Sequence, residues 1–223
     1  MSSGTATSLR SVLEALERYG LLLELDAQLP SLVSIVAGGP VRGSWWGHAS
    51  GNIIYEVGNQ LANHPDVLVI KLVSGKVTFV QRRLWPAVIS VATAREPWQV
   101  QDLSDMARTL LDSVTKEHTL RVDLFQKSAH LNAKALSDAA RELERKLLVY
   151  GESVHTSSGA HAKLLETWEH WARRTSFAES QEPSEQGKIA LEDALLVLNR
   201  QFDAKGPAPE EIDVKSQYIS RSI

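Results

Sequence analysis

The chain has 223 residues, of which 43% are hydrophobic and 23% are charged. These fractions are typical of a globular protein and exclude a disordered or fibrous chain. The formal net charge of -3 excludes a protein that coats nucleic acid through its overall charge, so any phosphate-binding surface has to be local.

The chain contains no cysteine, which excludes disulfide bonds and thiolate metal sites and is typical of a reducing compartment. Its first residues lack the basic and apolar regions of a signal peptide, and no apolar run reaches the roughly 18 residues that a membrane-spanning helix requires. We therefore expect a cytoplasmic protein with no membrane partner.

The first part of the chain predicts three helices. Apolar residues from Leu9 to Leu16 fall at i, i+3, i+4 and i+7, which is the spacing of one helical stripe. Residues 29–39 indicate a second, short helix that ends at two glycines and a proline. A third stripe runs from Ile53 to Leu61, and Ser50 is its expected N-cap.

A β-hairpin is predicted after these helices, because β-branched runs at 67–73 and 77–81 flank a glycine-containing turn. Three helices followed by a hairpin are the element order of a winged helix. The pattern returns downstream, with helices expected at 103–114, 119–125 and 136–147 and two short β segments within 147–165. We therefore predict two similar units, residues 7–95 and residues 96–175.

The C-terminal part predicts two more helices. An amphipathic stripe runs from Ala160 to Trp171 and continues the second unit. Residues 176–188 have the composition of a solvated linker, residues 189–203 indicate a last helix, and residues 204–223 are expected to form a flexible tail. The predicted class is mainly α with short β-hairpins (α+β): tandem winged-helix units and a C-terminal helix.

The hairpin of the first unit is the strongest candidate for a DNA-contacting surface. Residues 67–95 contain five basic and no acidic side chains, which gives this segment a local charge of +5. The basic residues are Lys71, Lys76, Arg82, Arg83 and Arg95. In a winged helix such residues contact the phosphate backbone beside the groove. The alternative is a solvated hairpin whose lysines only protect an edge strand.

The third helix of the second unit presents a second candidate surface. Lys134, Arg141 and Arg145 lie on one helical face, opposite the leucine stripe. This arrangement suits a recognition helix. The favoured alternative is a plain solvated helix, because Asp138, Glu142 and Glu144 nearly balance the positive charge.

The segment Gly43–Asn52, with the sequence GSWWGHASGN, precedes the third helix of the first unit. Exposed Trp45 and Trp46 could stack on bases, with Arg42 and His48 beside them for phosphate. Alternatively, the glycines form a tight turn and the tryptophans cover the core. Adjacent residues of an extended segment point in opposite directions, so we expect one tryptophan in the core and the other at the surface.

Common catalytic and metal-binding motifs are absent from the sequence. The seven histidines do not show the spacing of a metal site, so no metal is expected. The nucleophile elbow, the phosphate-binding loop and the dinucleotide fingerprint are also missing, so we expect no cofactor and no common hydrolase, kinase or dehydrogenase chemistry.

Three segments resemble bacterial proteins of the AlkZ-related family, which are relatives of the YcaQ-like winged-helix DNA glycosylases. They are RGSWWGHASGN at 42–52, HPDVLVIKLVSGKVTFVQRRLWP at 64–86 and SDAARELERKLLVYGESVHTSSGAHAKLLETWEHWARR at 137–174. The likeness extends over about residues 9–175. It implies a tandem winged-helix protein that acts on DNA.

The resemblance also implies a candidate catalytic pair. The glycosylases use a Gln-Φ-Gln or Gln-Φ-Asp element whose polar side chains hold the attacking water, and Gln99-Val100-Gln101 matches this tripeptide. The tripeptide lies in the predicted connector, where a simple linker is the alternative. The chain is also shorter than those enzymes, which carry a further winged-helix unit.

We therefore expect a non-enzymatic protein that binds duplex DNA through the basic hairpin. One alternative is a DNA glycosylase that removes alkylated or crosslinked bases with Gln99 and Gln101. Another is an interaction module that binds a protein partner or a second copy of this chain.

Overall fold

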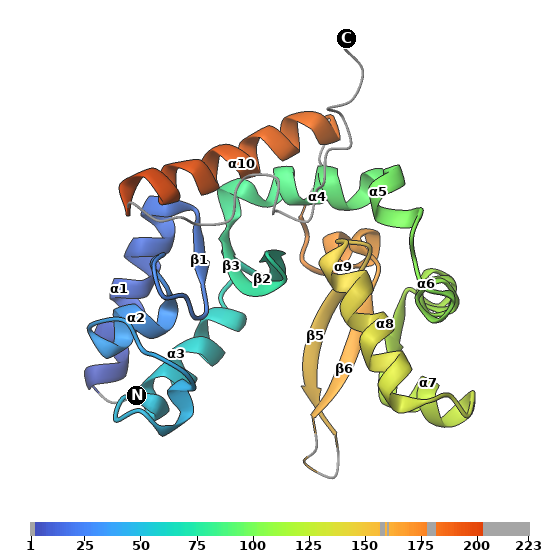
Figure 1. The fold of residues 1–223 in the computed structure, drawn as a ribbon, viewed down its shortest axis with the longest axis horizontal. Coiled ribbons are helices and arrows are strands. Elements are labelled where there is room, and N and C mark those ends of the chain that lie inside the picture. The colour runs from blue at the N-terminus through green and yellow to red at the C-terminus, as the bar shows by residue number, and fades with distance from the viewer. Residues whose placement is uncertain (1–2, 157–158, 160, 178–181, 203–223) are drawn as a thin grey trace.

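The computed structural model describes residues 3–156, 159, 161–177 and 182–202. Its helices surround two small antiparallel sheets, and this arrangement confirms the predicted α+β class (Figure 1). The predicted flexible tail at 204–223 lies outside the described residues. Among the described helices, none combines the length and the hydropathy that crossing a bilayer requires.

The same order of elements occurs twice. The first set is α1 (Ser3–Tyr19), β1 (Leu21–Leu23), α2 (Leu32–Ala37), α3 (Gly51–Ala62), β2 (Val67–Val73) and β3 (Lys76–Gln81). The second set is α6 (Asp105–Glu117), β4 (Thr119–Arg121), α7 (Val122–Ser128), α8 (Ala133–Arg145), β5 (Tyr150–His155) and β6 (His161–Glu166). The third strand lies in the middle of each sheet, in the orders β1-β3-β2 and β4-β6-β5. In each half, therefore, the third strand of the sheet is a short strand that pairs with the second strand of the hairpin. In the sequence this short strand lies between the first and second helices of its half.

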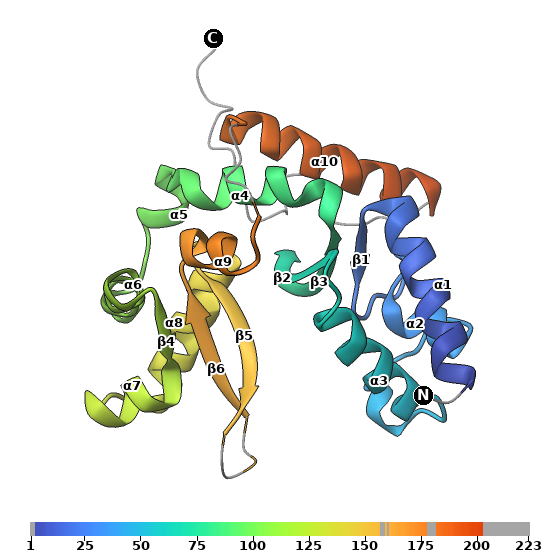
Figure 2. The same cartoon turned by 180° about the vertical axis from the view of Figure 1, so that it is seen from behind.

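The remaining elements connect and cover these two halves. They are the short helices η1 (Trp45–Gly47), η2 (Arg82–Leu84) and α5 (Pro97–Val100), and the helices α4 (Trp85–Ala94), α9 (Trp168–Arg174) and α10 (Ser184–Gln201). Helix α10 lies along α4 across one side of the molecule (Figures 1 and 2). The two helices approach closely at Gly187, where an added Cβ would lie 2.1 Å from Ser90 Oγ. A side chain at this position would separate the helices.

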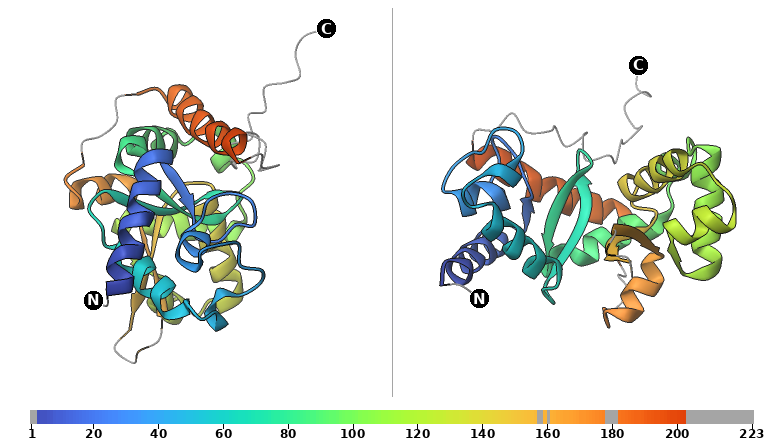
Figure 3. Two further views of the ribbon diagram at one scale, coloured as in Figure 1. Left: turned by 90° about the vertical axis from the view of Figure 1, so that its left-hand side faces the viewer. Right: turned by 90° about the horizontal axis from the view of Figure 1, so that it is seen from below.

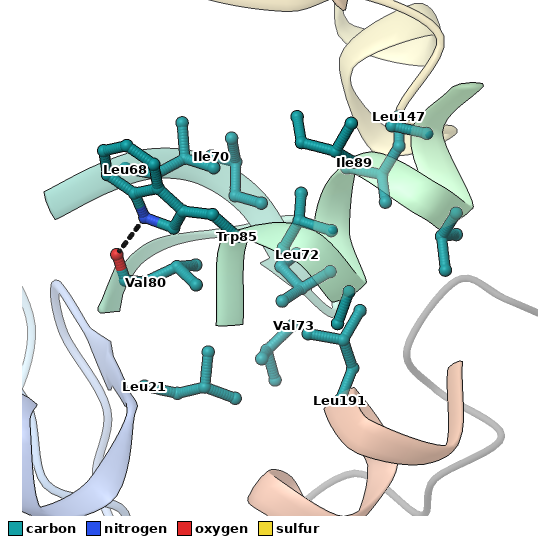
Figure 4. Packing of buried hydrophobic residues seen from close by; sticks show 14 of the residues in the cluster. Leu21, Leu68, Ile70, Leu72, Val73, Val80, Trp85, Ile89, Leu147 and Leu191 are labelled. Atoms are coloured by element: carbon teal, nitrogen blue, oxygen red, sulfur yellow. Dashed lines mark hydrogen bonds between the residues drawn. The ribbon is translucent and has the colours of Figure 1, made fainter. Parts of the chain in front are cut away.

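A shared hydrophobic core joins the two halves. Buried residues of β2, β3, α4 and α10 pack with Leu147 of the second half (Figure 4). Trp168 and Trp171 of the second half belong to the same cluster. Trp85 is buried at this junction, and its Nε1 donates a hydrogen bond to Val80 O at 3.1 Å. The junction thus contains large apolar side chains whose polar groups are satisfied, which fixes the two halves against each other. Two further hydrophobic clusters are present, and each of them fills the helical part of one half.

Several predicted boundaries were wrong. The stretch 119–125 was expected to be a helix, but it begins with strand β4, and the stripe from Ala160 to Trp171 is divided between β6 and α9. Strand β1 and helix α4 were not predicted. The last helix begins at Ser184, within the expected linker, because its polar first turn docks on the connector through contacts that composition does not indicate.

Candidate nucleic-acid interface

The hairpin of β2 and β3 lies against α8 of the second half. Gly75 adopts a φ of 68° at the turn, and an added Cβ there would lie 3.0 Å from Arg145 Nε. Lys71 Nζ on β2 lies 2.9 Å from Glu144 Oε2 on α8. The other oxygen of this buried carboxylate lies 2.8 Å from Lys163 Nζ on β6. Lys71 and Arg145 are therefore part of the contact between the two halves.

Lys76 is held by the first half itself. Its Nζ lies 2.8 Å from Asp26 Oδ2, in the loop after β1. Burial by itself would raise the pKa of Asp26, but hydrogen bonds from the Leu29 backbone N–H, from Lys76 and from the Gln28 N–H outweigh it, so the pKa is lowered. The carboxylate therefore stays charged and keeps the lysine at the loop.

Arg82 and Arg83 directly follow β3, and both bind within the chain. The Arg82 guanidinium donates to Pro65 O at 3.2 Å, lies 3.6 Å from Asp66 Oδ1 and stacks over the Trp85 ring at 5.0 Å. The Arg83 guanidinium donates to two carbonyl oxygens of the last turn of α1, those of Glu17 and Arg18. A cation at this helix end interacts favourably with the helix dipole.

Each of the four hairpin cations thus has an intramolecular partner, and these partners come from α1, from two loops and from α8. The segment 67–95 contains no acid, which is why its charge resembled a free basic patch in the sequence. DNA contact by these four residues stays a prediction, and the structure gives each of them a stabilising contact as well.

The outer face of α8 remains open over its N-terminal part. Lys134 is exposed, and Arg141 pairs with Asp138 at 3.3 Å while both side chains stay more than half exposed. A shallow hollow of about 410 Å³ lies on this face, lined by Asp138, Arg141, Glu142, Arg145 and Lys146. This face therefore offers both charges and hydrogen-bonding groups to a partner, and its C-terminal end is bounded by the hairpin turn at Gly75.

An aromatic platform lies at the start of α3. Trp45 is 8% exposed and Trp46 is 67% exposed, which confirms that one tryptophan packs in the core and the other faces solvent. Their rings stack with centroids 4.3 Å apart, and Tyr55, which is 44% exposed, lies 5.7 Å from Trp46. Trp46 and Tyr55 therefore offer two neighbouring aromatic rings to solvent at the start of α3.

The backbone around this platform is a tight turn. An added Cβ at Gly51 would lie 3.1 Å from Trp46 O, so a side chain there would crowd the backbone of the turn. His48 Nδ1 accepts the Ser50 N–H at 3.1 Å, and Arg42 is exposed just ahead of the turn. Ser50 directly precedes α3, although its side chain makes no capping hydrogen bond.

Gln99 and Gln101 occupy different environments. Gln99 is fully buried, and its Nε2 donates to Lys146 O at 2.9 Å while its Oε1 accepts the Glu96 N–H at 2.8 Å. Gln101 is exposed at the end of α5. Both polar ends of the Gln99 amide are thus hydrogen-bonded to backbone groups. These bonds explain why a glutamine is buried here without any catalytic role. Catalysis by this pair stays a prediction.

The family model described as AlkZ related matches residues 6–206. This chain belongs to the AlkZ-related family. The match confirms the family resemblance read from the three segments. Searches of the curated proteins and of the solved structures gave no match for this AlkZ-related protein.

No residue of the β5–β6 hairpin in this AlkZ-related protein was predicted from the sequence to be a site residue. This hairpin extends away from the rest of the molecule (Figures 1 and 2). His155 on β5 and His161 on β6 are direct partners in its register, and both are exposed. In the sequence, the two histidines lie on either side of the polar turn at similar distances from it. This spacing indicates a site only when the structure shows that the hairpin projects from the molecule. Among the described residues, no group of three or more His, Asp or Glu side chains is placed to hold a metal ion.

Proposed function

We propose that this AlkZ-related protein binds duplex DNA through two winged-helix units, without excising bases. One observation carries the proposal: the order helix, strand, helix, helix, hairpin occurs in both halves with the same strand order. In helix-turn-helix and winged-helix proteins the last helix of this set enters the major groove. Helices α3 and α8 occupy this position here, and family membership supports the same function.

The open face of α3 is suited to base contacts. Asn52, Tyr55 and Asn59 are exposed along it, and the helix contains no basic residue. Asparagine can form two hydrogen bonds to adenine in the major groove. Trp46 stands at the beginning of this face and can stack on a base or pack against a sugar. Arg42 supplies a positive charge for phosphate beside it.

The open face of α8 supplies the cations that α3 lacks. Lys134 and Arg141 are exposed on it, and arginine suits both guanine and phosphate. We therefore place the main charged contacts on α8. Arg82 and Arg83 contribute less in this proposal, because Arg82 donates to Pro65 O and lies over the Trp85 ring, and Arg83 donates to two carbonyl oxygens at the end of α1.

The absence of base excision is the second part of the proposal. Gln99 would have to release two backbone partners and reach solvent before it could hold a water for attack on a sugar. Exposing a fully buried side chain in this way would disrupt the packing of α5 against the end of α8.

The experiment is a measurement of duplex DNA affinity by fluorescence anisotropy over a series of salt concentrations. Each phosphate contact contributes about 0.9 to the slope of log affinity against log salt, so K134A/R141A should lower the slope by about 2. Lys116 is exposed on α6, and K116A is the matched control that should leave the slope unchanged. R82A/R83A should change the slope by less than one.

Two results would contradict the proposal. Absence of binding at low salt in the wild-type protein would exclude duplex DNA as the partner. Strand breaks after incubation with alkylated DNA and cleavage of abasic sites would show base excision, and their loss in Q101A would assign it to the glutamine pair.

A further inference from the structure

The two hairpins of the molecule differ in what they contact. The hairpin of β2 and β3 is in contact with α8 through Lys71 and through the turn at Gly75. The hairpin of β5 and β6 packs on the second half at its base, and its described outer part projects from the molecule in the front, back and side views (Figures 1, 2 and 3). Of the two, the second therefore exposes the last described residues of its strands, His155 and His161, to solvent beside the α8 half.

Two histidines lie at the outer end of this hairpin. His155 and His161 face each other across the strands, with ring centroids 4.4 Å apart and an angle of 47° between the rings. Both are exposed. Two positions toward the body, Lys163 pairs with Ser153 in the register, and its Nζ is held by Glu144. Lys163 is thus already paired with Glu144 and is not available for a phosphate. The imidazoles of His155 and His161 are the remaining side chains of this hairpin that can carry a positive charge.

The surrounding charges come from three elements. Glu152 is exposed on β5, and α8 contributes Glu144, which Lys71 and Lys163 neutralise. Helix α7 packs against β6 and carries Lys127, which is exposed, and Asp123, which is bound by Arg121 at 2.7 Å. Among these carboxylates, only Glu152 is without a cation at salt-bridge distance in the described residues.

Proton uptake and phosphate binding reinforce each other at such a pair. Histidine is the side chain that ordinarily changes charge between about pH 5 and pH 8. Two like charges at a ring-centroid distance of 4.4 Å repel each other. A phosphate oxygen between them offsets this repulsion, so DNA binding is accompanied by proton uptake.

We propose that the β5–β6 hairpin is the DNA-contacting wing and that His155 and His161 form a proton-dependent contact with the phosphate backbone. This inference rests on the proposed function and adds its regulation: DNA affinity increases as pH falls from 8 to 6. The ligand is duplex DNA, recognised by its phosphates and not by its sequence.

The experiment measures affinity for one labelled duplex at pH 6 and pH 8, each over a series of salt concentrations. Wild-type affinity should rise toward pH 6, by up to about tenfold per pH unit for each proton taken up. The salt slope should become steeper by about 1 to 2, because each charged imidazole adds one phosphate contact. H155Q/H161Q should lose most of both changes.

Two further variants keep the result unambiguous. H155K/H161K carries a permanent charge and should bind at pH 8 as tightly as the wild type does at pH 6. His118 lies at the start of β4, opposite the other end of β6, so H118N is the control that should keep the wild-type pH dependence. Circular dichroism verifies that each variant is folded.

The possible failures are distinguishable. If the wild type binds no DNA at either pH, the proposed function is wrong and this inference is wrong with it. If the wild type binds DNA and H155Q/H161Q keeps an undiminished pH dependence, or H155K/H161K binds no better at pH 8, only the wing assignment is overturned.

Discussion

Lys71 Nζ and Glu144 Oε2 lie 2.9 Å apart and connect β2 of the first half to α8 of the second. The Glu144 side chain is 8% exposed, and Lys163 binds its other oxygen. An added Cβ at Gly151 would lie 2.2 Å from Glu144 Oε1, so the neighbouring strand also leaves space for this carboxylate. Together with the apolar junction around Trp85, this contact sets the orientation in which the two halves present α3 and α8.

Replacing Glu144 should destabilise the protein. E144Q leaves two partly buried lysines without their carboxylate, and we expect the free energy of unfolding to fall by about 2 to 4 kcal/mol. Urea denaturation measures this change. The control is D138N, which removes an exposed pair with Arg141 and should change stability by less than about 1 kcal/mol. Equal effects of the two substitutions would mean that Glu144 does not hold the halves together.

The two glutamines of the tripeptide should behave differently. Q99A leaves two backbone partners unsatisfied in a buried site and should lower the free energy of unfolding by about 2 to 3 kcal/mol. Q101A alters an exposed side chain and should change stability by less than about 0.5 kcal/mol. Thermal denaturation compares them, and a stable Q99A protein would remove the packing explanation for Gln99.

The adjacent tryptophans should separate stability from binding. W45A empties a buried site and should reduce the free energy of unfolding by about 3 to 5 kcal/mol. W46A should leave stability nearly unchanged but weaken DNA binding by about 1 to 3 kcal/mol, the usual contribution of an aromatic ring stacked on a base. Anisotropy titrations and urea denaturation of both variants test this pattern, which unchanged DNA affinity in W46A would contradict.

The docking of α10 should depend on pH through Glu96. This carboxylate accepts hydrogen bonds from Trp98 Nε1 at 2.8 Å and Ser184 Oγ at 2.5 Å, and Lys188 Nζ lies 2.5 Å from it. Burial alone would raise the pKa of Glu96, but the hydrogen bonds from Lys188, Ser184 and Trp98 outweigh it and lower the pKa below the ordinary value of 4.5.

A lowered pKa means that the unfolded state binds more protons than the folded state near pH 4, so stability increases with pH in this range. The contribution of Glu96 is therefore complete above about pH 5 and is lost as the pH falls through its folded pKa. Wild type should exceed E96Q in stability by about 1 to 2 kcal/mol at pH 7, and the difference should decline toward pH 3. A difference that is constant from pH 3 to pH 7 would exclude this role.

Much of the fold was encoded locally. The apolar stripe from Ile53 to Leu61 predicted α3, and the β-branched runs around Gly75 predicted β2 and β3. The adjacent positions of Trp45 and Trp46 correctly predicted that one ring is buried and the other is exposed. These features depend on spacing within about ten residues, since helical and strand periodicities are properties of the local backbone.

Other elements depended on their neighbours. Strands β1 and β4 have three residues each, too few to show a period, and they form because β3 and β6 supply their hydrogen bonds. Helix α4 is buried on nearly all sides, so its apolar residues make no stripe that would distinguish a helix. Helix α10 begins in a polar segment because Ser184 and Lys188 dock on Glu96.

The sequence by itself determined the family, the α+β class and most of the longer helices, because these follow from residue types and their local spacing. Only the tertiary structure decided which charges are available to a partner. The partners of Lys71 and Lys76 are 73 and 50 residues away, and such pairs form only when packing brings distant segments together. The same packing holds the basic hairpin against α8 and leaves the hairpin with His155 and His161 exposed to solvent.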